Sequence, residues 1–242
     1  MNDTCAPWHR QAVTAIVSQL WLKAFGIPLL IGVFFAAYFY LLRNPAYPIT
    51  VMPLTALDRL IGFQPLALPL YLSIWVYVSL PPALLTTRRE LKTYAMDIGL
   101  TCLIGLLVFY FWPNTVPVGN IDWALSPTVG LLKDLDAAGN ACPSLHVATA
   151  AFSSLWIDHL LRRIGTPRWV LVVSWIWFVG ISYSTLATRQ HVSIDVLAGL
   201  ALGLTAGWLS LRLHGFRIEP GQVDPAHLIK CHTDFYEDEH RA

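Results

Sequence analysis

The chain has 242 residues, of which 55% are hydrophobic and 13% are charged, and its formal net charge at pH 7 is +1. Soluble domains carry about 25% charged residues, and the mean hydropathy here is +0.54. This composition excludes an ordinary soluble globular protein and indicates an integral membrane protein.

Hydrophobic runs with few charges mark the predicted transmembrane segments, because about 20 apolar residues in a helix cross a bilayer. The sequence contains six such runs, at 24–42, 66–86, 93–112, 143–161, 169–187 and 194–211. We therefore predict an all-α, polytopic membrane protein with six transmembrane helices. The predicted organisation is an N-terminal cytoplasmic or interfacial segment (1–23), a six-helix catalytic membrane domain (24–213) and a polar cytoplasmic tail (214–242).

Basic residues predict the orientation of these segments, since cytoplasmic loops are enriched in Lys and Arg. Most of the 16 basic residues fall on one side when the N-terminus, the second and fourth loops and the tail share that side. This arrangement places both termini in the cytoplasm of a cell inner or plasma membrane. The starts of the fourth and sixth runs then open on the periplasmic or extracellular face.

Two outer loops flank those openings. The loop at 43–65 holds four prolines and is expected to be extended and irregular. The loop at 114–141, between the third and fourth runs, is predicted to contain a short interfacial helix with Ser126 as N-cap, Pro127 at its first position and Gly139 just past its end. This helix is expected to lie over the site.

A histidine and an aspartate four residues apart stand at the start of the last run. On a helix, His191 and Asp195 would lie on one face, where a carboxylate can hold an imidazole in one tautomer. Gly199, Gly203 and Gly207 continue this row at steps of four, and such small residues let a neighbouring helix approach closely. The row is therefore expected to face protein. Ionisable groups at membrane depth are costly and indicate a functional site.

His146 is the predicted partner of this pair, and it ends the sequence Pro-Ser-Leu-His at the start of the fourth run. Pro143 is favoured in the first turn of a helix, so Ser144 and His146 would occupy that turn beside unsatisfied backbone N–H groups. A helix N-terminus with a serine hydroxyl beside it is a suitable cradle for phosphate.

Together these two stretches resemble the type 2 phosphatidic acid phosphatase superfamily of membrane enzymes. Its second motif, Pro-Ser-Gly-His, is similar to residues 143–146, and its third motif ends in a histidine and an aspartate that match His191 and Asp195. The leucine in Pro-Ser-Leu-His and the run from 190 to 199 look more like the branch that contains inositol phosphorylceramide synthase. Members of that branch move a phosphorylated head group between lipids.

Two departures from the family pattern concern its basic residues. The first motif, a lysine, six residues and then Arg-Pro, keeps only Pro113, with Gly105 and Trp112 at the basic positions. In the third motif, Thr185 replaces the arginine, and a basic residue stands instead at Arg189. The residues that would hold a phosphate are therefore not fixed by the resemblance.

The resemblance implies a lipid phosphatase or phosphotransferase that works through a phosphohistidine. In that scheme His191 attacks phosphorus, Asp195 orients and stabilises its imidazole, and His146 protonates the leaving group and later activates water or an acceptor hydroxyl. No cofactor and no metal are required.

Other residues of the outer side are candidates to bind the substrate. Its phosphate would contact Ser144, Arg189 and, as a weaker candidate, Lys133, the two basic residues being inferred from their positions. Tyr110 and Trp112 close the third run on that side and are candidate pocket residues, although an interfacial aromatic belt accounts for them as well.

Three alternatives remain at this level. The first is a transferase that moves a phospho-alcohol, such as phosphoinositol, to a lipid or alcohol acceptor. The second is a metal-dependent membrane hydrolase, since two histidines and a carboxylate can bind zinc or iron. The third is an ion-coupled transporter that uses the polar row as an ion path. In the enzyme interpretation the partner is a membrane lipid, and we expect neither nucleic acid nor an obligate protein partner.

Overall fold

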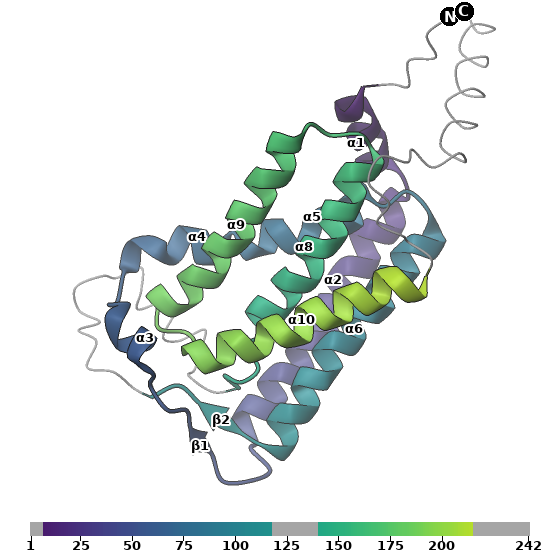
Figure 1. The fold of residues 1–242 in the computed structure, drawn as a ribbon. Coiled ribbons are helices and arrows are strands. Elements are labelled where there is room, and N and C mark those ends of the chain that lie inside the picture. Colours follow the sequence, from purple (N-terminus) through teal and green to yellow (C-terminus); the bar gives the residue numbers. More distant parts are fainter. Residues whose placement is uncertain (1–6, 118–139, 215–242) are drawn as a thin grey trace, which may run out of the picture.

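The computed structural model describes residues 7–117 and 140–214, and this part of the chain is mostly helical (Figure 1). A short helix, α1 (Trp8–Val17), precedes the long ones. Helices cover all six predicted runs: α2 (Leu20–Arg43), η1 (Pro65–Ala67) with α4 (Leu68–Leu72) and α5 (Ile74–Leu84), α6 (Arg88–Phe111), α8 (Leu145–Arg163), α9 (Arg168–Ala187) and α10 (Ser193–Leu213). The predicted interfacial helix, from Ser126 to Gly139, lies outside the described residues. Of its loop, only residues 114–117 and 140–141 are described.

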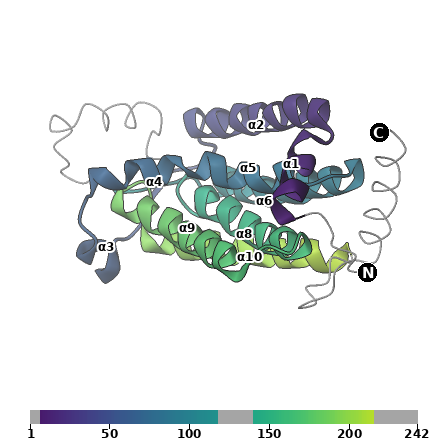
Figure 2. The same cartoon turned by 90° about the horizontal axis from the view of Figure 1, so that it is seen from above.

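Within the described residues, five helical segments are long and apolar enough to cross a membrane. They comprise α2, the segment 65–84, α6, α9 and α10. The fourth predicted span, α8, is not among them, so the predicted count of six is not confirmed. Helix α8 packs against α5, α6, α9 and α10, whereas α2 lies along one edge of the bundle (Figure 2). Because protein surrounds α8, it can bury the polar residues Ser153, Ser154 and Asp158.

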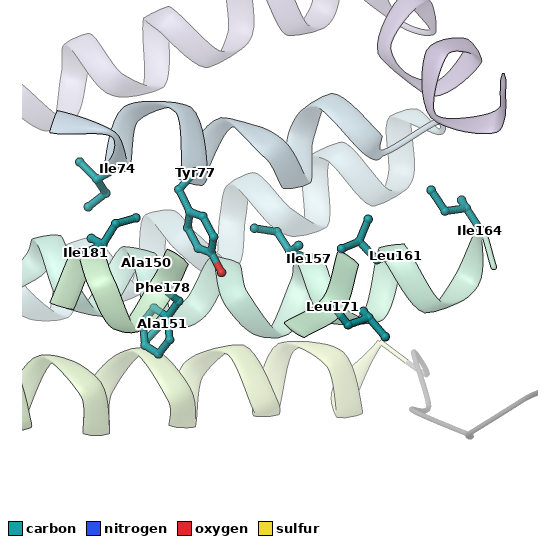
Figure 3. Close-up of a cluster of buried hydrophobic side chains, with 10 residues drawn as sticks. All are labelled: Ile74, Tyr77, Ala150, Ala151, Ile157, Leu161, Ile164, Leu171, Phe178 and Ile181. Carbon is teal, nitrogen blue, oxygen red and sulfur yellow. The ribbon is translucent and has the colours of Figure 1, made fainter. Parts of the chain in front are cut away.

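A buried apolar cluster joins α5, α8 and α9 at the centre of the bundle (Figure 3). Tyr77 of α5 points toward α8, and Phe178 of α9 approaches the same layer. Lipid tails are as apolar as these side chains, so close packing and dispersion contacts, rather than escape from water, hold such helices together.

Helix α10 packs against α8 through the predicted glycine ridge. A Cβ atom at Gly199 would lie 2.4 Å from the carbonyl oxygen of Ser144, and one at Gly203 would lie 2.1 Å from that of Ala148. Both distances are far too short for a side chain, so the two helices can approach this closely only with glycine there. The prediction that this row faces protein is confirmed.

One end of the bundle carries small elements around the turn between α9 and α10 (Figure 1). Strands β1 (Thr50–Val51) and β2 (Asn114–Thr115) pair in parallel, and helix α3 (Ala56–Leu60) follows β1. The prediction of an irregular loop over 43–65 is wrong for this part. Pro53 and Pro65 flank α3 instead of interrupting it, and a capping box between Thr55 and Asp58 begins it.

Candidate active site

His146 and His191 come together at the end of the bundle that carries α3. Their ring centroids lie 5.9 Å apart, with an angle of 59° between the ring planes. His146 is the second residue of α8, and His191 lies in the turn between α9 and α10. The structure therefore brings together the side chains of these two histidines, which are far apart in the sequence, and their catalytic partnership stays a prediction.

Asp195 determines where α10 begins, and this places His191 before the helix instead of on it. The Asp195 Oδ2 atom accepts a hydrogen bond from the backbone N–H of Val192 at 3.0 Å, which makes Val192 the N-cap. The prediction that His191 and Asp195 share a helix face is wrong in this detail. The two side chains still approach each other, with 3.7 Å between His191 Nδ1 and Asp195 Oδ2.

This pair is buried and incompletely hydrogen bonded. His191 is 9% exposed and Asp195 is fully buried, and in the described part of the chain neither His191 Nδ1 nor Asp195 Oδ1 has a hydrogen-bond partner. An unsatisfied buried polar group costs about 1–3 kcal/mol. Moving the imidazole by about 0.5 Å would bring Nδ1 within hydrogen-bond range of Oδ2. That bond would leave His191 Nε2 as the nitrogen available for reaction.

The Cys142 thiol is a further neighbour of this carboxylate. Burial raises the pKa of Cys142 to about 11, and the nearby charge of Asp195 contributes to the increase. The thiol is therefore neutral at physiological pH and adds no charge to the site.

Tyr71 of α4 fixes the plane of the His146 ring. The two rings stack with 4.7 Å between centroids and 28° between planes, and Tyr71 is only 3% exposed. A stacked aromatic face favours an imidazolium over an uncharged ring. Sequence reasoning missed Tyr71, because an aromatic residue in an apolar run has no distinguishing local pattern.

Ser144 is the N-cap of α8, whose first helical residue is Leu145. Its Oγ atom accepts the N–H of Val147 at 3.3 Å, and its own N–H donates to the carbonyl oxygen of Asp195 at 3.0 Å. Ser144 is fully buried. Its backbone thus joins the starts of α8 and α10, while its predicted contact with phosphate stays a prediction.

Asn114 holds the segment that leads into α8. Its Oδ1 atom accepts the N–H groups of Ala141 and Cys142 at 2.8 and 2.6 Å. Its Nδ2 atom donates to the carbonyl oxygens of Trp112 and Cys142 at 2.9 and 2.8 Å. With 1% of its surface exposed, Asn114 fixes the approach to residues 143–146. Sequence reasoning missed it, because its partners on that segment lie far along the chain.

Arg189 follows the end of α9 in a left-handed backbone conformation, with φ of 60°. Its N–H donates to Leu186 O at 3.0 Å, and the N–H of Gln190 donates to Thr185 O at 3.1 Å. These two bonds form a Schellman motif, whose left-handed position is usually glycine. An L residue in that conformation costs about 1–2 kcal/mol.

The opposite end of the bundle has the same motif with the usual residue. After α8, Gly165 has φ of 71° and donates to Arg162 O at 3.1 Å, and Thr166 donates to Leu161 O at 3.0 Å. Of the two helix ends compared, after α8 and after α9, the one beside the histidines has a non-glycine residue in this conformation, which Gln19 and Asn140 also adopt elsewhere in the described residues. Strain at such a position favours a functional role for the arginine side chain.

The structure gives a physical reason for two of the three replacements at the basic positions of the family pattern. Leu145, in place of the family's glycine, packs on Gly105, in place of its lysine, and a Cβ atom at Gly105 would lie 2.4 Å from Leu145 Cδ2. Thr185 is fully buried, and its hydroxyl donates to Ser182 O at 2.8 Å. These two positions are closed by packing, whereas Trp112, at the remaining basic position of the pattern, is 42% exposed.

The remaining predicted residues are less closely tied to the histidines. Tyr110 and Trp112 are 43% and 42% exposed. The Tyr110 ring lies 6.4 Å from that of Tyr47, and Trp112 Nε1 donates to Thr50 Oγ1 at 3.0 Å. They therefore face the loop 43–65, while Lys133 lies outside the described residues.

Within residues 7–117 and 140–214, no three His, Cys, Asp or Glu side chains lie close enough together to hold a metal ion.

Comparison with known proteins adds one finding. The profile of the PAP2 superfamily matches residues 91–219, which is more than half of the chain. The match includes α6 from residue 91 onward and all of α8, α9 and α10, and with them His146, His191 and Asp195. No curated protein and no solved structure matches the chain.

Proposed function

Because the chain belongs to the PAP2 superfamily, we propose that it is an integral membrane lipid phosphatase or phosphotransferase that forms a phosphohistidine at His191. One observation carries the proposal. The ring centroids of His146 and His191 lie 5.9 Å apart, and the Asp195 carboxylate lies 3.7 Å from Nδ1 of His191. These three groups supply a nucleophile, a proton donor and an orienting charge.

The first half-reaction transfers the phosphoryl group to the protein. His191 Nε2 attacks phosphorus, the bond from phosphorus to the lipid oxygen breaks, and protonated His146 gives its proton to that oxygen. Asp195 holds Nδ1–H and stabilises the positive charge that the imidazole gains on phosphorylation. Tyr71 keeps the His146 ring in the plane needed for this transfer.

The second half-reaction returns the enzyme to its starting state. His146, now neutral, removes a proton from water or from an acceptor hydroxyl, whose oxygen attacks the phosphohistidine. The bond between phosphorus and nitrogen breaks and His191 is released. Water gives hydrolysis, and a lipid alcohol gives transfer. Transfer of a phosphorylated head group is the second candidate function. The leucine at position 145 supports it, because Pro-Ser-Leu-His looks more like the motif of the inositol phosphorylceramide synthase branch.

Positive charge for the phosphate oxygens comes from Arg189 in this proposal. Its backbone lies two residues before His191, and its side chain is partly exposed. The first turn of α8 beside Ser144 adds backbone N–H groups and the positive end of a helix dipole. Lys133 is a further candidate, and Tyr110 with Trp112 would border the lipid entry.

The substrate in this proposal is a lipid phosphate or phosphodiester that enters from the outer leaflet. The distribution of basic residues supports a site on the periplasmic or extracellular face with both termini cytoplasmic. No cofactor takes part in the scheme.

The test is phosphate release from a panel of lipid phosphates by the purified protein in detergent, with and without EDTA. His191→Ala is compared with the control His214→Ala. His191 lies beside Asp195 at the start of α10, and His214 lies beside Asp97 at its other end. We expect EDTA-resistant release that only His191→Ala abolishes. A labelled head group that appears on a lipid alcohol without phosphate release would assign the transferase, and loss of activity in EDTA would contradict the scheme.

A further inference from the structure

The carboxylate of Asp58, in the first outer loop, binds the first residue of α10. Asp58 Oδ1 accepts the N–H of Ser193 at 2.7 Å, and Oδ2 accepts the Ser193 hydroxyl at 3.0 Å. Oδ2 also accepts the N–H and the hydroxyl of Thr55, both at 2.8 Å. Asp58 is 5% exposed, so this carboxylate is buried and fully hydrogen bonded.

These bonds keep Asp58 ionised. Burial alone would raise the pKa of Asp58, but the hydrogen bonds from Thr55 and Ser193 outweigh it and lower the pKa below its usual value. The carboxylate therefore binds the start of α10 as an anion, and charged hydrogen bonds of this kind are stronger than neutral ones.

The same loop is attached on the other side of the active-site turn. The N–H of Gln64 donates to Ala187 O, at the end of α9, at 2.8 Å, and its side-chain amide donates to Tyr183 Oη at 2.9 Å. Between the two attachments, Ile61 packs with Leu186 and Val196, which lie before and after the turn. Residues 55–64 therefore bridge the turn 188–192, which carries Arg189 and His191.

The turn needs such support because the glycine ridge does not reach it. Close packing of α10 on α8 begins at Gly199, and one backbone hydrogen bond, from the N–H of Ser144 to Asp195 O, joins the start of α10 to α8. These contacts hold the body of α10 without the bridge. The bridge adds a separate attachment for the first turn of α10 and for the turn 188–192 that precedes it. This attachment helps to set the orientation of both. A displacement of about 1 Å at a reacting group can cost about 100-fold in rate.

We propose that residues 55–64 brace the active-site turn, and that Asp58 is a positioning residue that holds His191 and Arg189 in place for phosphoryl transfer. This inference rests on the proposed function, to which it adds a segment that does not touch the reacting atoms. In the described part of the chain, Asp58 is bonded to α10 through Ser193.

The experiment compares Asp58→Asn with a matched variant, Asp97→Asn. Asp97 also binds a serine of α10, Ser210, but at the opposite end of the helix, about 25 Å away at 1.5 Å per residue. We expect Asp58→Asn to lower kcat about 10- to 100-fold with little change in KM. Asp97→Asn should leave kcat unchanged even if it lowers the thermal stability.

Two further measurements separate positioning from general destabilisation. Amide hydrogen exchange of residues 188–192 should become faster in Asp58→Asn and not in Asp97→Asn. Ser193→Ala, which removes one hydroxyl and serves if Asp58→Asn does not fold, should lower kcat in the same direction. Its effect should add only in part to that of Asp58→Asn, because both substitutions alter the contact between the Ser193 hydroxyl and Asp58 Oδ2.

The outcomes distinguish this inference from the proposed function. Wild-type kcat and wild-type exchange at 188–192 in both Asp58→Asn and Ser193→Ala would overturn the brace, and so would equal effects of Asp58→Asn and Asp97→Asn. Faster exchange restricted to 188–192 supports the brace whether or not the tested lipid phosphates are substrates. An active His191→Ala variant would overturn the proposed function and leave the exchange result standing.

Discussion

Replacing Arg189 by glycine should make the protein inactive without making it less stable. Arg189 has φ of 60°, and an L residue in this region costs about 1–2 kcal/mol. Glycine removes that cost but adds about 0.4–1 kcal/mol of backbone entropy to the unfolded chain. The net expectation for Arg189→Gly is therefore a stability between unchanged and roughly 1.5 kcal/mol higher.

The effect on activity has the opposite sign. If the guanidinium stabilises the charge that develops on the phosphate oxygens, its removal should lower kcat about 100- to 1,000-fold, as for other preorganised donors. Most point mutations reduce stability, by about 0.5–3 kcal/mol. The combination of higher stability with lost activity is therefore diagnostic of a strained functional residue.

Gly165→Arg is the matched control, because Gly165 occupies the same position of the same motif at the far end of α8. It should lower stability by an amount up to roughly 1.5 kcal/mol and leave kcat unchanged. The assays are thermal unfolding in detergent and initial rates of phosphate release. Full activity of Arg189→Gly would refute its contact with phosphate, and a large loss of stability would refute the strain argument.

Three more predictions concern other parts of the structure. Asp195→Asn should lower kcat about 100- to 10,000-fold, but it keeps an oxygen that can accept the Val192 N–H and so should keep the helix cap. Asp195→Ala should lower kcat as well and should also lose about 0.5–2 kcal/mol of stability in thermal unfolding, because the cap is gone. Gly203→Ala places a Cβ atom 2.1 Å from a carbonyl oxygen and should cost about 1–3 kcal/mol, whereas Gly99→Ala, with open space around it, should be neutral or slightly stabilising. The lowered pKa of Asp58 gives stability that is present above its unfolded pKa, about 3.9, and lost as the pH falls through the folded value. Denaturation measured from pH 6 to pH 3 should therefore show the difference between wild type and Asp58→Asn shrinking below about pH 4, and a constant difference would contradict this.

Features with a local signature could be predicted from the sequence. The helical runs follow from continuous apolar stretches, and the face of α10 follows from glycines at steps of four. The proximity of His146 and His191 follows from two motif halves on one predicted side of the membrane. The span count is not confirmed at α8, because a helix surrounded by protein does not need the apolar surface that a lipid-facing helix needs.

Features that depend on distant partners could not be predicted in the same way. Asn114 binds Ala141 and Cys142, and Asp58 binds Ser193, so nothing near either residue in the sequence shows what it contacts. A partial signal existed for Asp58, since Thr-x-x-Asp is a capping-box pattern, but the prolines around it favoured an irregular loop. His191 was placed on the helix because the spacing alone does not show that Asp195 caps α10 with its own side chain.

The central claim is that His191 carries the phosphoryl group during turnover, and trapping the labelled protein tests it most directly. The enzyme is mixed with a lipid phosphate labelled in its phosphoryl group, quenched in alkali within one turnover and digested for peptide mapping. We expect label on the peptide that contains His191, stable in alkali, lost in acid and absent from His191→Ala. Turnover without labelled protein, or label that remains in His191→Ala, would contradict the account.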